Sequence, residues 1–205
     1  MGLEKYRHGF TVTLHVDCLD EPYSWKGNKT VFVCSMSDLF HKDVPFKFID
    51  RIMEVIEKTP QHTYQLLTKR AERMAEYFAK RAVPKNVMLG VTVDDWKGKE
   101  RIEYLKSIKT DCVKFLSCEP LLEYLGDLNL DGIDWVIVGG ESGNNARRML
   151  KPWVENIQRY CKRFNVAFFF KQWGSWGEDG IKRNKKANGC LLNGKIVQEY
   201  PKRKN

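Results

Sequence analysis

Six short apolar runs recur along the chain at intervals that fit alternating strands and helices. Successive starts lie 32, 24, 26, 22 and 32 residues apart, for runs beginning at Val31, Thr63, Val87, Val113, Trp135 and Ala167. This spacing predicts βα units that build a parallel sheet. The runs show little alternation of apolar and polar residues, which favours strands covered on both faces. A stretch at residues 10–16 does alternate, and it predicts a seventh strand near the start of the chain.

Amphipathic helices are predicted between these strands, most clearly over residues 45–58 and 152–164. Right-handed crossovers place such helices outside the sheet. We therefore expect an α/β fold, an incomplete (β/α) TIM-like barrel with about seven mostly parallel strands and outer helices. A doubly wound sheet has the same element order, but nearly every run ends in polar residues, and a barrel brings all those ends to one mouth. The predicted division is a single barrel-like domain over residues 1–180 and a basic C-terminal tail over residues 181–205.

The polar residues that follow the runs form the predicted site at this mouth. Three of them are candidate catalytic groups, namely Glu119, Glu141 and Lys171. Ten more are candidate ligand-binding residues: Ser35, Asp38, His41, Lys69, Arg70, Asp94, Ser142, Arg147, Gln172 and Trp173. No residue is assigned as a metal ligand.

Each candidate role has a structural alternative. Carboxylates at Glu119 and Glu141 suit acid–base chemistry or a metal, or they neutralise neighbouring lysines and arginines. Lys171 follows three phenylalanines and suits either a Schiff base or an ion pair with one of the glutamates. His41 suits a general base oriented by Asp38, or a partner for nearby backbone and carboxylate groups.

Glycines and tryptophans mark the two loops after the last strands. The pair Gly139-Gly140 lets either a ligand or another backbone come close, so it begins a functional loop or an ordinary strand-to-helix turn. Trp173 and Trp176, on a loop with glycines, suit a lid, a stacking surface or a cap that closes the barrel mouth.

The net charge of +9 is concentrated in the last third of the chain. Residues 1–144 carry 20 lysines and arginines against 22 acidic residues, whereas residues 145–205 carry 15 against 4. Such a basic region either binds the phosphates of nucleic acids or keeps the chain end soluble. No apolar run is long enough to span a membrane. The six cysteines form no C-x-x-C pair, which indicates a reducing compartment and hence a cytoplasmic protein.

Six sequence motifs occur in order at residues 33–41, 67–70, 89–94, 115–121, 136–143 and 169–174. Together they resemble a phage-associated, uncharacterised family named after phage gene products 37 and 68, which has a three-cysteine motif and a radical-SAM-like barrel. The resemblance implies a [4Fe–4S] cluster and S-adenosylmethionine as cofactors. The letters Gly139-Gly140-Glu141 also resemble the element that contacts the amino group of S-adenosylmethionine in that superfamily.

The family's cysteine motif lies in an N-terminal segment that this chain is expected to lack, so the cysteine ligands of the cluster are expected to be absent. That segment also supplies the first barrel strand. Its absence predicts an exposed sheet edge at residues 11–16 or 31–36, covered by a dimer partner or by a separately encoded piece.

The leading hypothesis is an uncharacterised phage-associated protein whose barrel mouth binds a polar small molecule or nucleotide, and which is catalytically incomplete without the cysteine segment. Two alternatives stay open. One is a lyase or aldolase type of barrel enzyme that uses Lys171 with Glu119. The other is a nucleic-acid-binding module based on the basic C-terminal region.

Overall fold

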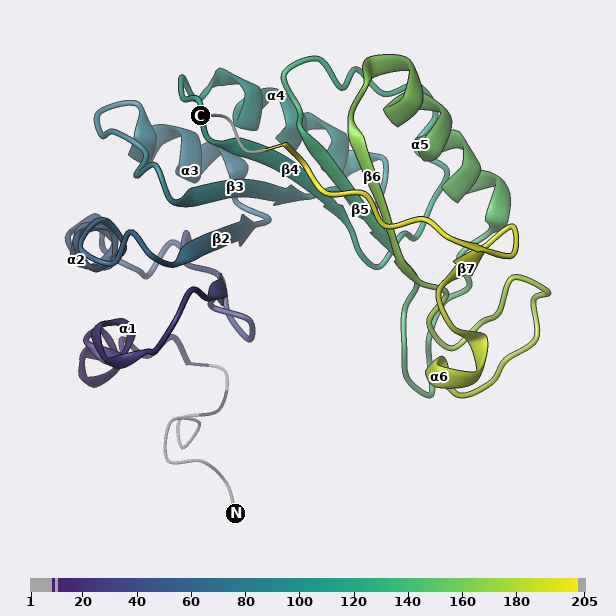
Figure 1. The fold of residues 1–205 in the computed structure, drawn as a ribbon, viewed down its shortest axis with the longest axis horizontal. Helices are drawn as coiled ribbons and strands as arrows, with labels where there is room; N and C mark the ends of the chain where they lie inside the picture. The colour runs from purple at the N-terminus through teal and green to yellow at the C-terminus, as the bar shows by residue number, and fades with distance from the viewer. Residues whose placement is uncertain (1–8, 10, 203–205) are drawn as a thin grey trace.

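A curled sheet of six parallel strands forms a half-barrel in the computed structural model, which describes residue 9 and residues 11–202 (Figure 1). The strands lie side by side in the order of the chain. They are β1 (Thr30–Val33), β2 (Thr63–Thr68), β3 (Val87–Thr92), β4 (Val113–Cys118), β5 (Trp135–Gly139) and β6 (Ala167–Gln172). The predicted α/β class and the incomplete barrel are confirmed.

The longer helices cover the convex side of the sheet (Figure 1). They are α2 (Phe46–Glu57), α3 (Ala71–Phe78), α4 (Glu100–Ser107) and α5 (Lys151–Phe164). Shorter elements are η2 (Val16–Cys18), α1 (Glu21–Ser24), η3 (Lys97–Lys99) and α6 (Lys185–Asn188), together with the antiparallel pair β7 (Leu191–Leu192) and β8 (Lys195–Ile196). No helix within residues 11–202 is long and apolar enough to cross a membrane.

The sequence of α5 explains both its boundaries and its packing. Pro152 lies in its first turn, where the missing N–H costs no hydrogen bond, and Asn165 ends the helix in the left-handed conformation. Between them, Val154, Ile157 and Cys161 are buried on one stripe and join the core between helices and sheet.

The structure contains six strands in this sheet, and the predicted seventh strand is wrong over the part that can be described. Residues 11–15 form no regular element, Val16 begins the short η2 helix, and Phe10 lies outside the described residues. Val12, Leu14 and Val16 are 37%, 37% and 48% exposed. An alternating stretch forms a strand only where a neighbouring strand and a core receive it, and here neither does.

The two edges of the sheet differ. Along β6, residues 197–199 run antiparallel, because Phe170 N–H donates to Val197 O and Glu199 N–H donates to Phe168 O. The other edge is β1, which pairs only with β2 among the described strands. Phe32 on β1 is 43% exposed. The exposed edge expected at residues 31–36 is therefore present over the part that belongs to β1, while residues 34–36 form a turn. The division at residue 180 stays a prediction.

Aromatic side chains pack together on the concave face of β4, β5 and β6. Trp135 lies 6.0 Å from Phe115 and 5.9 Å from Phe169, centroid to centroid, and Tyr200 from the C-terminal segment packs against both Trp135 and Phe169. The Phe115 ring lies directly over Gly90, where a Cβ atom would come within 2.3 Å of it. This packing fills the inside of the half-barrel near the starts of its strands and leaves the polar residues at the strand ends above it.

Candidate functional site

The carboxyl ends of the strands turn toward the hollow side of the arch, and the arrowheads of β2 to β5 point to its middle (Figure 1). This is the mouth predicted from the sequence. The polar residues after the strands do not form one continuous ring of free groups. They form separate hydrogen-bonded groups, and only one of these leaves a buried side-chain polar atom without a hydrogen-bond partner among the described residues.

The first group is centred on Asp38 and ties the loop after β1 to the end of β2. Its carboxylate accepts hydrogen bonds from the Thr68 hydroxyl at 2.7 and 2.9 Å, from the Lys69 N–H and from Arg70 Nη1 at 2.7 Å, and also from the Phe40 N–H. These hydrogen bonds hold Asp38 and Arg70 in place, and their role in ligand binding stays a prediction.

Two other candidates from the same loop lie apart from this group. His41 Nδ1 accepts a hydrogen bond from the Asp43 N–H at 3.2 Å and lies 3.5 Å from the Asp43 carboxylate. Asp43, and not Asp38, is therefore the carboxylate beside His41. Ser35 is exposed in the turn that follows β1.

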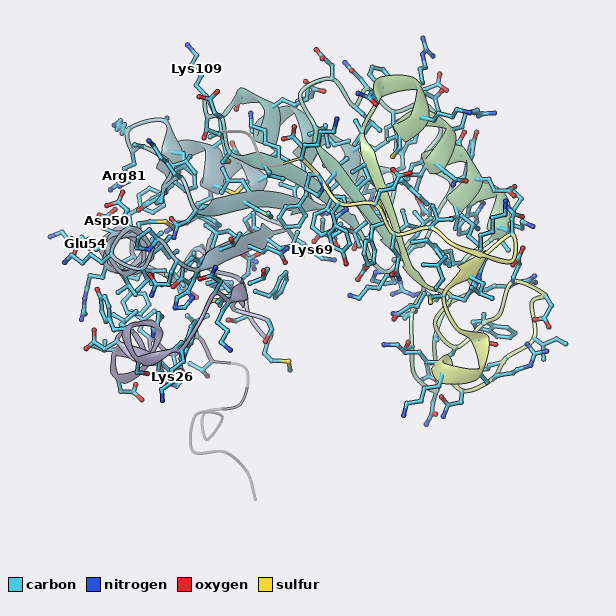
Figure 2. The ribbon with its side chains drawn as sticks, in the orientation of Figure 1. Lys26, Asp50, Glu54, Lys69, Arg81 and Lys109 are labelled. Atoms are coloured by element: carbon cyan, nitrogen blue, oxygen red, sulfur yellow. The ribbon has the colours of Figure 1, made fainter. Side chains whose placement is uncertain are left out.

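The second group is centred on Asp94, which is 7% exposed at the end of β3. Its carboxylate contacts Lys69 Nζ on one side and accepts from Arg101 Nη1 at 3.1 Å on the other, and Arg101 also donates to Thr92 O at 2.7 Å. Burial acts to raise the pKa of Asp94, but the hydrogen bond and charge of Lys69, a backbone hydrogen bond and the hydrogen bond of Arg101 outweigh it and lower the pKa. Figure 2 shows Lys69 at the end of β2 on the concave side.

The third group joins β4 to β6 across β5. Lys171 Nζ donates to Glu119 Oε2 at 2.7 Å, and the Lys171 side chain is 50% exposed. The other oxygen, Glu119 Oε1, is buried and has no hydrogen-bond partner within the described part of the chain. Gly139 lies against this carboxylate, because a Cβ atom there would be 3.2 Å from Oε1. Glu119 is thus held in place with one acceptor unsatisfied.

An open hollow of about 320 Å³ lies beside this glutamate. Its lining residues come from the loops after β4 and β5, from the end of β6 and from α6, and they are Glu119, Pro120, Gly140, Glu141, Ser142, Gln172 and Lys185. Four of the predicted site residues meet here, namely Glu119, Glu141, Ser142 and Gln172. Lys185 was missed by the sequence reasoning, because nothing in a run of C-terminal lysines indicates that one of them folds back onto a strand end.

Glu141 forms the fourth group with Arg147. Its two oxygens accept from Arg147 Nε and Nη2, each at 2.8 Å, and from the Arg147 N–H at 2.7 Å. These hydrogen bonds lower the pKa of Glu141 from 4.5 to about 2. The negative charge of Asp94 also helps to raise the pKa of Arg147, so this pair interacts electrostatically with the second group.

Replacement of Glu141 by glutamine is expected to make the free energy of unfolding depend less on pH in the acid range. Since the pKa of Glu141 is lower in the folded state, its contribution is complete above pH 4.5 and is lost as the pH falls toward 2. The effect should stay below about 1 kcal/mol, because the Arg147 side chain is 61% exposed. Urea unfolding from pH 6 to 2 measures it, with Glu76→Gln on the exposed face of α3 as control. If the free energy of unfolding depended on pH in the same way for Glu141→Gln and for wild type, the pairing of Glu141 with Arg147 would be contradicted.

The glycines after β5 allow two backbones to pack together and leave no room for a ligand between them. A Cβ atom on Gly140 would lie 1.9 Å from Trp173 O, and one on Gly174 would lie 2.2 Å from Glu141 O. Trp173 is 2% exposed, and its indole N–H donates to Leu191 O at 2.8 Å. Trp173 therefore lies in the core between the loop after β6 and β7. The indole N–H of Trp176 donates to Ala146 O, which ties the loop after β6 to the loop after β5.

The cysteines do not fit the cluster that the resemblance implies. Cys112, Cys118 and Cys161 are buried, while Cys18, Cys34 and Cys190 are partly exposed at separate places in the fold. Burial raises the pKa of both Cys118 and Cys161, which disfavours the thiolate that iron requires. Within residues 11–202, no group of three or more His, Cys, Asp or Glu side chains could hold a metal ion.

Comparison with known proteins places the chain in one family. A family model described as protein of unknown function (DUF5131) matches residues 1–201, which is nearly the whole chain, so the chain belongs to that family. No curated protein and no solved structure matches it.

Proposed function

We propose that this member of the family binds a nucleotide at the mouth of its half-barrel, in the hollow beside Glu119. The observation that carries the proposal is the buried acceptor Glu119 Oε1, which has no donor within the described chain. A buried carboxylate oxygen without a hydrogen bond costs free energy unless a ligand or water supplies a donor. Ribose hydroxyls and the exocyclic amines of bases are such donors, and carboxylates bind ribose hydroxyls in dinucleotide sites.

The charges around the hollow also suit a nucleotide. Glu119 and Glu141 already have Lys171 and Arg147 as partners, at 2.7 and 2.8 Å. Lys185 lines the same hollow and has no acidic partner among the described residues. A ligand that offers a donor to Glu119 and an anionic group to Lys185 satisfies both, and a nucleotide carries both on one molecule.

The resemblance to radical-SAM-like barrels supports the same ligand class, since S-adenosylmethionine is itself a nucleoside derivative. The phage association and the radical chemistry that the resemblance implies stay predictions. A Lys171-dependent lyase gains less support, because Lys171 is half exposed and ion-paired, whereas Schiff-base lysines lie in apolar surroundings.

Replacement of Glu119 by glutamine is expected to weaken nucleotide binding about tenfold or more, because a hydrogen bond to a charged group is worth about 1.5–3 kcal/mol. Isothermal titration calorimetry with AMP, ATP, GTP and S-adenosylmethionine measures the dissociation constants. Glu178→Gln is the matched control, because Glu178 is also ion-paired with a lysine, Lys151, but does not line the hollow.

The proposal fails if none of these probes binds wild type at millimolar concentration, or if Glu119→Gln binds them as tightly as wild type does. Ribose itself, tested as a competitor, distinguishes the two donors. Competition by ribose assigns the Glu119 contact to the sugar.

A further inference from the structure

The loops after β5 and β6 carry a group of lysines and arginines beside the hollow. Four exposed cations have no acidic partner among residues 11–202, namely Arg148, Lys182, Lys185 and Lys186. We call these four residues the basic surface. The other cations of this region are neutralised, because Lys151 pairs with Glu178 at 2.5 Å, Arg183 with Asp179 at 2.6 Å and Arg147 with Glu141.

The loops that carry the basic surface interlock. Lys182 Nζ donates to Asn144 O, and the Arg148 guanidinium lies over Gly180, where a Cβ atom would come within 2.2 Å of it. The Ser175 hydroxyl accepts from the Gly143 N–H at 2.9 Å. These contacts hold two loops that are some 30 residues apart in sequence against each other. The cations are therefore presented together, at the side of the mouth where α6 lies (Figure 1).

We propose that the basic surface binds the phosphates of a single-stranded nucleic acid, one nucleotide of which enters the hollow beside Glu119. The inference rests on the proposed function for the identity of that nucleotide. Charge complementarity supports it, since residues 145–205 carry 15 basic against 4 acidic residues, while the rest of the chain carries slightly more acidic residues.

The unsatisfied acceptor distinguishes a nucleic acid from other polyanions. The carboxylates of an acidic peptide and the phosphates of an anionic lipid surface match the cations, but these groups are themselves acceptors and cannot donate to Glu119 Oε1. A nucleic acid brings phosphates to the cations and hydroxyl or amino donors to the carboxylate. The nucleotide at the hollow must be unstacked and unpaired to enter it, which selects single strands over duplexes.

The test is the salt dependence of binding to fluorescein-labelled RNA and DNA oligonucleotides of about 12 nucleotides, followed by fluorescence anisotropy. Wild type is expected to bind more weakly as salt rises. The double variant Lys182→Gln/Lys186→Gln, which leaves the lining residue Lys185 intact, should lower the slope of log K against log salt by about 1.4, because each contact with a single strand contributes about 0.7.

The matched control is Lys26→Gln/Lys109→Gln, which removes the same charge from two lysines far from α6 (Figure 2). This control should leave the slope unchanged. An equal loss in both double variants would show that only net charge matters, and it would overturn the proposal. So would a flat salt response, or equal competition by poly-glutamate and by unlabelled oligonucleotide.

Glu119→Gln separates this inference from the proposed function. If mononucleotides bind through Glu119 but oligonucleotides bind no tighter and ignore Lys182→Gln/Lys186→Gln, the strand-binding inference falls and the nucleotide site stands. If oligonucleotides bind through the basic surface but ignore Glu119→Gln, the basic surface stands without the nucleotide in the hollow. Loss of oligonucleotide binding in both variants, but not in the control, supports both proposals.

Discussion

Replacement of Gly140 by alanine is expected to destabilise the protein by about 3 kcal/mol, the upper part of the usual range for forcing an atom into a packed site. The new Cβ atom would lie 1.9 Å from Trp173 O and 2.7 Å from its carbonyl carbon. Both are backbone atoms of a buried residue, so neither can swing away as a flexible side chain would. The two loops must separate to admit the methyl group. Urea unfolding measures the loss.

Gly132→Ala is the control for the Gly140 substitution. Gly132 has a φ of +74° and no atom within 4 Å of its Cβ position, so its replacement reports backbone strain alone, about 1 kcal/mol. A loss at Gly140 no larger than the loss at Gly132 would mean that the loops after β5 and β6 move apart freely. Restoration of stability by a second substitution in the core is not expected, because the clash is with backbone.

Replacement of Asp94 by asparagine is expected to cost about 3 kcal/mol, because it leaves Arg101 without its carboxylate in a largely buried place. Lys69, which is 53% exposed, contributes less to this loss. Asp94 is 9% exposed at its side chain and Arg101 is 21% exposed. The isosteric change keeps the volume, so the loss reports charge and hydrogen bonding. Thermal or urea unfolding at pH 7 measures it.

The loss in free energy of unfolding caused by Asp94→Asn is expected to depend on pH in one direction. The pKa of Asp94 is lowered in the folded protein, so its contribution is present above its unfolded pKa of 3.8 and is lost as the pH falls below that value. The difference between wild type and variant should therefore shrink in acid. Asp50→Asn is the control, because Asp50, on α2, is 38% exposed and ion-paired with Arg81, which follows α3 (Figure 2). Asparagine keeps an acceptor for the Tyr77 hydroxyl, which also donates to Asp50. Its loss should be about 1 kcal/mol or less. Equal losses at the two positions would contradict the importance of burial at Asp94.

The strands were predictable because each is an apolar run followed at once by polar residues. A different rule, the alternation of apolar and polar residues, failed at residues 11–16, because alternation does not reveal whether a neighbouring strand exists to pair with the segment. β1 has its one partner in β2, and the described residues supply none on its other side. A sequence records the preference of a segment for extended backbone, whereas strand formation also requires a neighbour.

The convergence of polar strand ends was also predictable, but their pairing was not. Lys171 could reach either glutamate by sequence reasoning, and the structure pairs it with Glu119 while Glu141 pairs with Arg147. Arg101 comes from the first turn of α4, where an arginine has no visible link to a strand end. Such partners depend on how the connecting loops fold back, and local periodicity contains no information about that.

Every pairing within the six-stranded sheet joins a strand to the next one along the chain. Each therefore closes a short loop, and loop-closure entropy stays small at every step. The sheet can grow one βα unit at a time, in the order in which a ribosome releases the units. The last addition is different, since residues 197–199 run antiparallel to β6 and occupy the edge on which another parallel unit would have to form. Addition of a further parallel strand is blocked at that edge, whereas no described strand pairs with the outer edge of β1.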